Sequence, residues 1–198
     1  VAMLANQNMN YLISGDTPVR MGNAHMNIVP YQVFETSDGH IIIAVGNDQQ
    51  FVRFCKVIGC PELSSNPKYI KNSDRLANRA ELIDLVSKII VGRSSADWLR
   101  DLKEAVVPCG AINTIDQVFE DPQVQHRGLM QELPHPLSGV VPQVVNPIKY
   151  SGTPLEFENA PPMLGQHTDE ILKSVLGLSD DKIADLQGRG VTEMQKFR

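Results

Sequence analysis

The segment best suited to chemistry is a short polar loop at residues 22–27, which contains Gly22, Asn23, Ala24, His25, Met26 and Asn27. A glycine lets the backbone approach a ligand closely, and free backbone amides in such a loop can hold a carbonyl oxygen or an anion. His25 adds a ring that can donate, accept or transfer a proton near neutral pH. Because the loop has only one glycine, a plain connector with a surface histidine is the alternative interpretation.

A second group of polar side chains follows about twenty residues later, at the junction of an expected strand and an expected helix. It consists of Asn47, Asp48, Gln49 and Gln50. The free amides at a helix start and neighbouring carboxamides can hold a polar ligand group. A routine helix cap is the alternative.

Signals for other kinds of chemistry are weak. The sequence contains no G-x-S-x-G or H-E-x-x-H pattern, and the histidines at 126 and 135 stand among prolines without further ligands. Adjacent carboxylates such as Glu120 and Asp121 do not face one another on a regular element. We therefore expect no metal site and no hydrolytic triad.

Composition limits the possible partners. The chain has 198 residues, with 18 Lys and Arg scattered among 23 Asp and Glu, for a formal charge of -5. This leaves no basic stripe for a nucleic acid, and no apolar window approaches the roughly 20 residues that span a bilayer. Three cysteines without a C-x-x-C pair suit a reduced compartment. We expect a soluble, cytoplasmic protein with no nucleic-acid or membrane partner.

The loop at 22–27 must be positioned by the elements beside it. Residues 1–13 have the pattern of the tail of a helix whose start is missing, ending near Gly15 and Pro18. After the loop, Ile28–Thr36 and His40–Val45 are β-rich runs around Asp38-Gly39, a strong hairpin signal. A helix capped by Asn47 or Asp48 should then run to Gly59.

Further helices are expected along the rest of the chain. Apolar periodicity predicts one over residues 78–91, and Ser94 with Asp97 marks another that is broken at residues 107–110. A short helix is expected over 114–120, and two more start at Thr168 and Ser179. Between them, proline-interrupted apolar runs predict strands and extended linker. Without regular βαβ alternation, the fold class is α+β.

Several motifs, in the order in which they occur along the chain, resemble those of the family III CoA-transferases. This family includes formyl-CoA and carnitine CoA-transferases. The most specific is Pro-Pro-Met-Leu-Gly-Gln-His-Thr at 161–168. The others are 22–25 running into Ile28-Val29-Pro30-Tyr31, the Asp38-Gly39 turn, 44–51, Arg75 with Asn78-Arg79, and 107–110. Within the family, the chain looks most like enzymes that pass CoA between dicarboxylates, of the succinate and hydroxymethylglutarate type.

The resemblance implies a reaction and a division of roles. In the family, an aspartate upstream of this segment attacks an acyl-CoA thioester, and the resulting anhydride is resolved through the CoA thiolate and a carboxylic acid acceptor. No catalytic residue is then expected in this chain, and CoA thioester is a substrate, with no permanently bound cofactor. The resemblance makes residues 22–27 a lid over the site, although Ala24-His25-Met26 replaces the family's glycines, with Tyr31 and residues 47–50 as its neighbours.

The resemblance also implies a domain organisation. Residues 1–20 would end a large-domain helix and linker, residues 21–130 would form a small α+β domain with an antiparallel hairpin, and residues 131–162 would be a proline-rich return linker. Residues 163–198 would be C-terminal helices that return to a missing α/β large domain. Family protomers are interlocked, so the expected partners are the N-terminal half of the enzyme and a second copy.

Two alternatives remain. A 2-methylacyl-CoA racemase shares this fold and uses a glutamate near the hairpin–helix junction, where this chain has residues 47–50. Asp48 could take that role if the alignment shifts by one residue. The second alternative is a non-catalytic fragment or subunit that needs a partner chain.

Overall fold

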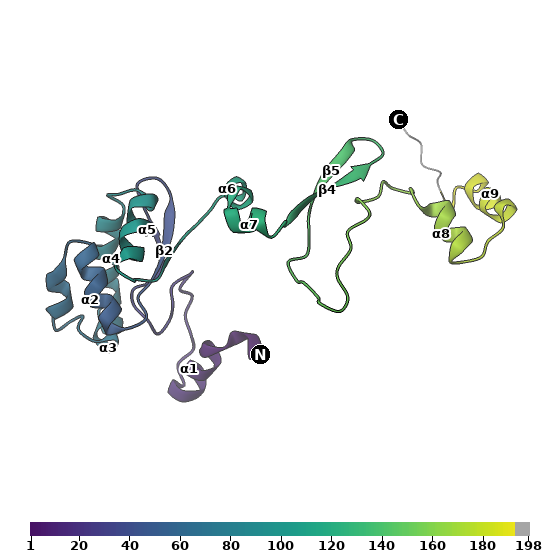
Figure 1. Ribbon diagram of the computed structural model, residues 1–198. Coiled ribbons are helices and arrows are strands. Elements are labelled where there is room, and N and C mark those ends of the chain that lie inside the picture. The colour runs from purple at the N-terminus through teal and green to yellow at the C-terminus, as the bar shows by residue number, and fades with distance from the viewer. Residues whose placement is uncertain (193–198) are drawn as a thin grey trace. The chain divides into compact units, whose positions relative to one another are not determined.

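A computed structural model describes residues 1–192 (Figure 1). The chain divides into two compact units, one from Val1 to Asn113 and one from Thr114 onward. Helices alternate irregularly with two small antiparallel sheets, which confirms the predicted α+β class. The predicted boundaries near residues 20, 130 and 162 refer to a longer enzyme and remain a prediction.

The sheet of the first unit contains three antiparallel strands in the order β1 (Tyr31–Glu35), β2 (His40–Ala44) and β3 (Cys109–Ala111). The hairpin predicted around Asp38-Gly39 is confirmed, with Phe34 opposite Ile41. The first strand is shorter than predicted because the backbone groups of Val29 bond to side chains instead of a strand. The helix break predicted at 107–110 is confirmed, but its last residues begin β3, a strand that was not predicted.

Four α-helices lie on one side of this sheet (Figure 1). They are α2 (Asp48–Val57), α3 (Asn72–Ala77), α4 (Arg79–Ile90) and α5 (Ser95–Glu104), with a 3-10 turn, η2, at Pro61–Ser65. The predictions for α2, α4 and α5 are confirmed, including caps at Asn47 and Ser94. Their apolar faces meet the sheet in one core that includes Phe34, Ile41, Ile43, Phe54, Leu82, Val86, Ile90, Trp98 and Leu102.

The N-terminal segment differs from the continuous helix predicted for residues 1–13. A 3-10 turn, η1 (Ala2–Leu4), is separated from α1 (Asn6–Ser14) by Ala5, whose φ of 41° lies in the left-handed region. Apolar periodicity does not reveal such a break, because alanine is a strong helix former. The predicted end is confirmed, since Gly15 caps α1 in the left-handed conformation.

The second unit contains short elements. These are α6 (Ile115–Glu120), α7 (Pro122–His126), the hairpin of β4 (Met130–His135) and β5 (Gly139–Val144), α8 (Thr168–Ser174) and α9 (Asp180–Gly188). The helix predicted over 114–120 is confirmed as α6, which Thr114 caps, and Ser179 is the predicted N-cap of α9. The cap predicted at Thr168 is wrong by one residue, because His167 is the N-cap and Thr168 lies in the helix. The C-terminal prediction for 193–198 lies outside the described residues.

None of the helices in residues 1–192 combines the length and the apolar character that crossing a membrane requires.

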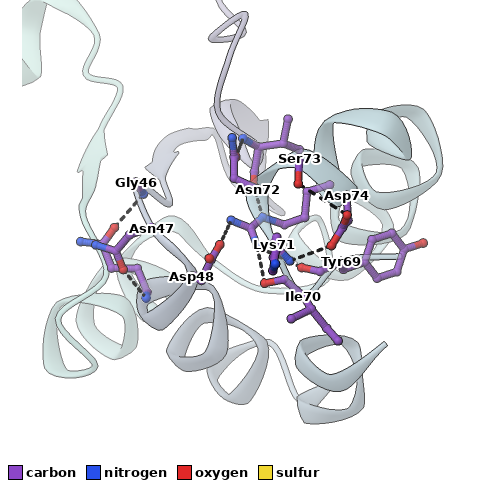
Figure 2. Close-up of polar contacts among 12 residues, drawn as sticks. Gly46, Asn47, Asp48, Tyr69, Ile70, Lys71, Asn72, Ser73 and Asp74 are labelled. Carbon is purple, nitrogen blue, oxygen red and sulfur yellow. Dashed lines mark hydrogen bonds and ion pairs between the residues drawn. The ribbon is translucent and has the colours of Figure 1, made fainter. Parts of the chain in front are cut away.

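One buried cation connects several segments of the first unit. The Arg75 side chain is fully buried, and its Nε donates to the carbonyl of Val29 at 2.7 Å. Its Nη1 donates to the carbonyls of Tyr69 and Ile70, and its Nη2 to Asp48 at 2.8 Å. Figure 2 shows Asp48, at the start of α2, close to the segment of Tyr69 and Ile70. A buried guanidinium is tolerated only when its donors are satisfied in this way.

We predict that Arg75→Met destabilises the first unit by about 3 kcal/mol, because buried carbonyls and a carboxylate lose their donor. Arg75→Lys should recover only part of this loss, since an ammonium cannot reach all four acceptors. Denaturant unfolding followed by fluorescence of Trp98, the only tryptophan, reports on this core. Lys88→Ala, which removes an exposed ion pair with Asp84, is the control and should cost under about 0.5 kcal/mol. Equal unfolding midpoints for Arg75→Met and the control would contradict the assignment.

A second polar network holds the hairpin turn against α5. The Asp38 carboxylate accepts from the backbone N–H of Ser95 at 2.7 Å and from the buried hydroxyl of Thr36 at 3.0 Å. The Thr36 hydroxyl also meets the Ser95 hydroxyl at 2.7 Å. The pKa of Asp38 is lowered, mainly by the hydrogen bond from the backbone N–H of Ser95. The folded protein therefore stabilises the charged form of the Asp38 side chain relative to its protonated form.

This lowered pKa predicts a dependence of stability on pH. A carboxylate with a depressed folded-state pKa stabilises the fold above its unfolded pKa of about 4, and this contribution is lost as pH falls through the folded-state value. Asp38→Asn should therefore reduce stability at pH 7 and make its decline below pH 4 shallower. Unfolding curves recorded from pH 7 down to pH 3 would check this. Parallel declines in the two proteins would show that the bond from Ser95 does not favour the charged form.

Candidate functional site

A cavity of about 390 Å³ lies beside the predicted loop. Five of the six predicted loop residues line it, from Asn23 to Asn27, together with the predicted neighbour Tyr31. The N-terminal segment Leu4–Gln7 completes the lining. Gly22 has a positive φ of 59° and precedes this lining. The structure thus brings most of the predicted loop and Tyr31 together around one hollow of ligand-binding size.

The His25 ring is held in a defined orientation within this wall. Its Nδ1 accepts a hydrogen bond from the backbone N–H of Asn27 at 3.1 Å. The ring stacks on Tyr31, with centroids 5.2 Å apart, and the backbone N–H of His25 donates to the carbonyl of Tyr31. Contacts to the ring and to the backbone therefore act together to restrict His25.

Two side chains from α3 and α4 hold the loop backbone. The guanidinium of Arg79 donates to the carbonyls of His25 and Met26 at 2.9 and 2.6 Å. Asn72 donates to the carbonyl of Asn27 at 2.7 Å and accepts from Val29 N–H at 3.2 Å. The second half of the loop is therefore tied to the helical core of the unit.

Further amides fasten the two ends of the loop. Asn10 of α1 and Asn27 exchange two side-chain hydrogen bonds of 3.2 and 2.9 Å. Asn23 accepts from the backbone N–H of Val33 in β1 at 2.9 Å. Asn10 and Asn72 carry no signal of a site residue in the sequence, and Arg79 stands out there only as part of a family motif. No local spacing links these residues to the loop, because they lie 17 to 54 positions from their partners.

The second predicted group, residues 47–50, is absent from the described lining of this cavity and is occupied by its own contacts. Asn47 accepts from the backbone N–H of Gln50 at 2.9 Å, and Gln50 accepts from the backbone N–H of Gly46 at 2.6 Å. Figure 2 shows this pairing at Gly46 and Asn47, beside Asp48. Asp48 binds Arg75. These contacts match the helix-cap interpretation of the group.

Metal or thiol chemistry finds no support in the geometry. Within residues 1–192, His, Cys, Asp and Glu side chains do not gather in threes in a way that could hold a metal ion. Burial raises the pKa of Cys55 to about 12, and burial also raises the pKa values of Cys60 and Cys109. Such thiols are protonated at neutral pH and are poor nucleophiles.

The cavity wall is suited to binding rather than to covalent attack. Its polar side chains are carboxamides, the His25 ring and the Tyr31 hydroxyl, with no Asp or Glu among the described lining residues. Carboxamides, imidazole and phenol can all donate hydrogen bonds to oxygen atoms of a ligand. An anchored loop also presents these donors without the cost of ordering them on binding.

We predict that Arg79→Ala loosens the loop without unfolding the unit. A hydrogen bond to a charged group contributes roughly 1.5–3 kcal/mol, so amide hydrogen exchange in residues 22–27 should accelerate by about tenfold or more. Arg53→Ala, which removes a bond to the carbonyl of Val106 elsewhere, is the matched control and should leave this peptide unchanged. Unchanged exchange in the Arg79 variant would show that other contacts suffice.

Comparison with known proteins places these features in a family. Residues 1–168 match CoA-transferase family III. The chain is 45% identical over 171 residues to a succinate–glutarate CoA-transferase of Agrobacterium fabrum, covering 86% of this chain and 43% of that protein. It is 41% identical over 196 residues to the human succinyl-CoA:glutarate CoA-transferase, covering 99% of this chain and 45% of that protein.

A solved structure agrees with these matches. A CAIB/BAIF family protein from Brucella suis superposes with a TM-score of 0.73 at 42% identity, covering 86% of this chain and 44% of that one. The chain therefore spans less than half the length of these relatives. The predicted resemblance, including the likeness to enzymes acting on dicarboxylates, is confirmed.

Proposed function

Because the chain belongs to CoA-transferase family III, we propose that it is the C-terminal portion of an acyl-CoA:carboxylate CoA-transferase that moves CoA between dicarboxylic acids. The observation that carries this proposal is the identity of 41–45% with two transferases named for succinate or succinyl-CoA and glutarate. CoA thioester and a free dicarboxylic acid are then the two substrates.

The chemistry of this proposal is shared between two parts of the enzyme. An aspartate in the part upstream of this chain attacks the thioester carbonyl, forming a mixed anhydride and releasing CoA thiolate. The anhydride must be protected from water and its developing oxyanion stabilised. Residues 22–27 would supply part of that enclosure, and the donor-lined cavity beside them supports this role.

The same proposal includes the missing half and a second copy as partners. Several large apolar side chains of η1 and α1 are mostly exposed, including Met3, Leu12 and Ile13. Exposed apolar surface of this kind is typical of a face that another part of a protein covers. In the proposed arrangement, residues 131–162 form the return linker and the C-terminal helices rejoin the large domain of an interlocked dimer.

The racemase alternative requires a proton-transfer group near the start of α2. Asp48 is the only carboxylate among residues 47–50, and it is engaged by the buried Arg75 at 2.8 Å. A carboxylate that holds a buried cation would have to abandon it in order to act as a base. This contact favours the transferase.

We predict that the chain alone does not transfer CoA from succinyl-CoA to glutarate, and that the full-length protein does, with the formation of glutaryl-CoA followed by chromatography. Adding the separately produced upstream part to this chain should restore activity if the two halves associate. Turnover by the chain alone would contradict the assignment of the nucleophile to the upstream part.

A second measurement distinguishes CoA transfer from racemisation. Incubation of the full-length protein with a 2-methylacyl-CoA in deuterated water should give no exchange of the 2-proton, because CoA transfer breaks no carbon–hydrogen bond. Rapid deuterium incorporation would favour the racemase.

A further inference from the structure

The cavity beside the loop contains one donor whose direction is set by the fold. His25 accepts the N–H of Asn27 through Nδ1 at 3.1 Å, so Nδ1 of the neutral ring carries no proton. In that tautomer the proton is on Nε2. Among residues 1–192, Nε2 makes no hydrogen bond, and the ring lines the cavity. Nε2–H is therefore available to a ligand.

The rest of the wall keeps this donor in place. Stacking on Tyr31 at 5.2 Å limits rotation of the ring. Arg79 and Asn72 hold the carbonyls of residues 25–27, so the backbone beneath the ring is also restrained. A donor restrained at both its ring and its backbone is preorganised, which is the condition for strong and selective recognition of an acceptor.

The electrostatic setting of the donor favours an anion. The described side chains that line the cavity include no carboxylate, so a negative ligand meets no repulsion from them. The Arg79 guanidinium lies directly behind the carbonyls of His25 and Met26 and adds positive charge to this wall. The carboxamides of Asn6, Gln7 and Asn23 provide further donors in the same lining.

We propose that His25 is a specificity-determining residue whose Nε2–H binds the free carboxylate of a dicarboxylic acid, the one that is not joined to CoA. This inference rests on the proposed function, because it assigns a role within that reaction. It explains how an enzyme of this kind distinguishes a dicarboxylic acid from a monocarboxylic acid of the same length.

Two substitutions of His25 distinguish the role of Nδ1 as an acceptor from the role of Nε2 as a donor. In His25→Asn, the side-chain oxygen can still accept the N–H of Asn27, but no donor reaches the position of Nε2. In His25→Gln, the longer side chain places an amide N–H near the position of Nε2. His40→Asn, at an exposed position at the start of β2, is the matched control.

The test compares glutarate with pentanoate, which lacks the second carboxylate, as CoA acceptors for the full-length protein. In His25→Asn, kcat/KM for glutarate should fall about tenfold, mainly through KM, while kcat/KM for pentanoate stays the same. His25→Gln should recover most of the loss, and His40→Asn should match the wild type. An equal loss for both acids in His25→Asn, or no loss for either, would overturn the inference.

Calorimetric titration of glutarate into the same proteins separates this inference from the proposed function. If the wild type shows no CoA transfer, the proposed function fails. The role of His25 would still be supported if glutarate bound about tenfold more weakly to His25→Asn than to the wild type and His25→Gln. If the wild type transfers CoA and all variants bind glutarate equally, the function stands and the role of His25 is wrong.

Discussion

The fully buried guanidinium of Arg75 is the constraint on which the first unit depends. A charge removed from water must have its donors satisfied, and here the acceptors come from three separate segments: Val29 two residues before β1, the turn after η2 and the start of α2. The guanidinium also lies 4.4 Å from the centre of the Phe51 ring, which adds a cation–π contact. These segments cannot shift independently without breaking a bond in the core.

Two residues close to Arg75 in the sequence extend this constraint to the candidate site. Asn72 and Arg79 stand three residues before and four residues after Arg75, and both bind the loop at 25–27. The position of the cavity wall therefore follows from how α3 and α4 are fixed to the core. A cavity wall fixed in this way can accept a ligand with little rearrangement, and in the function that we propose the covalent chemistry belongs to residues outside this chain.

Local patterns predicted much of this fold. Asp38-Gly39 marked the hairpin, apolar periodicity located α2 and α4, and Ser94 marked the start of α5, because each signal lies within the element that it forms. The short α3 and β3 were missed, since six and three residues are too few for a periodic pattern. The sequence also identified the loop at 22–27 as the candidate site. Its anchors could not be predicted, because contacts such as Arg79 to His25 depend on the tertiary fold.

The way the loop is held has an evolutionary consequence. Arg79 and Asn72 bind only main-chain carbonyls of residues 25–27, and every amino acid has such a carbonyl. Mutations can therefore exchange the side chains that face the cavity while the loop keeps its path. Because Arg79 and Asn72 hold residues 25–27 through the backbone, related proteins can vary the side chains of residues 24–26 at the cavity without rebuilding the helices that carry these anchors.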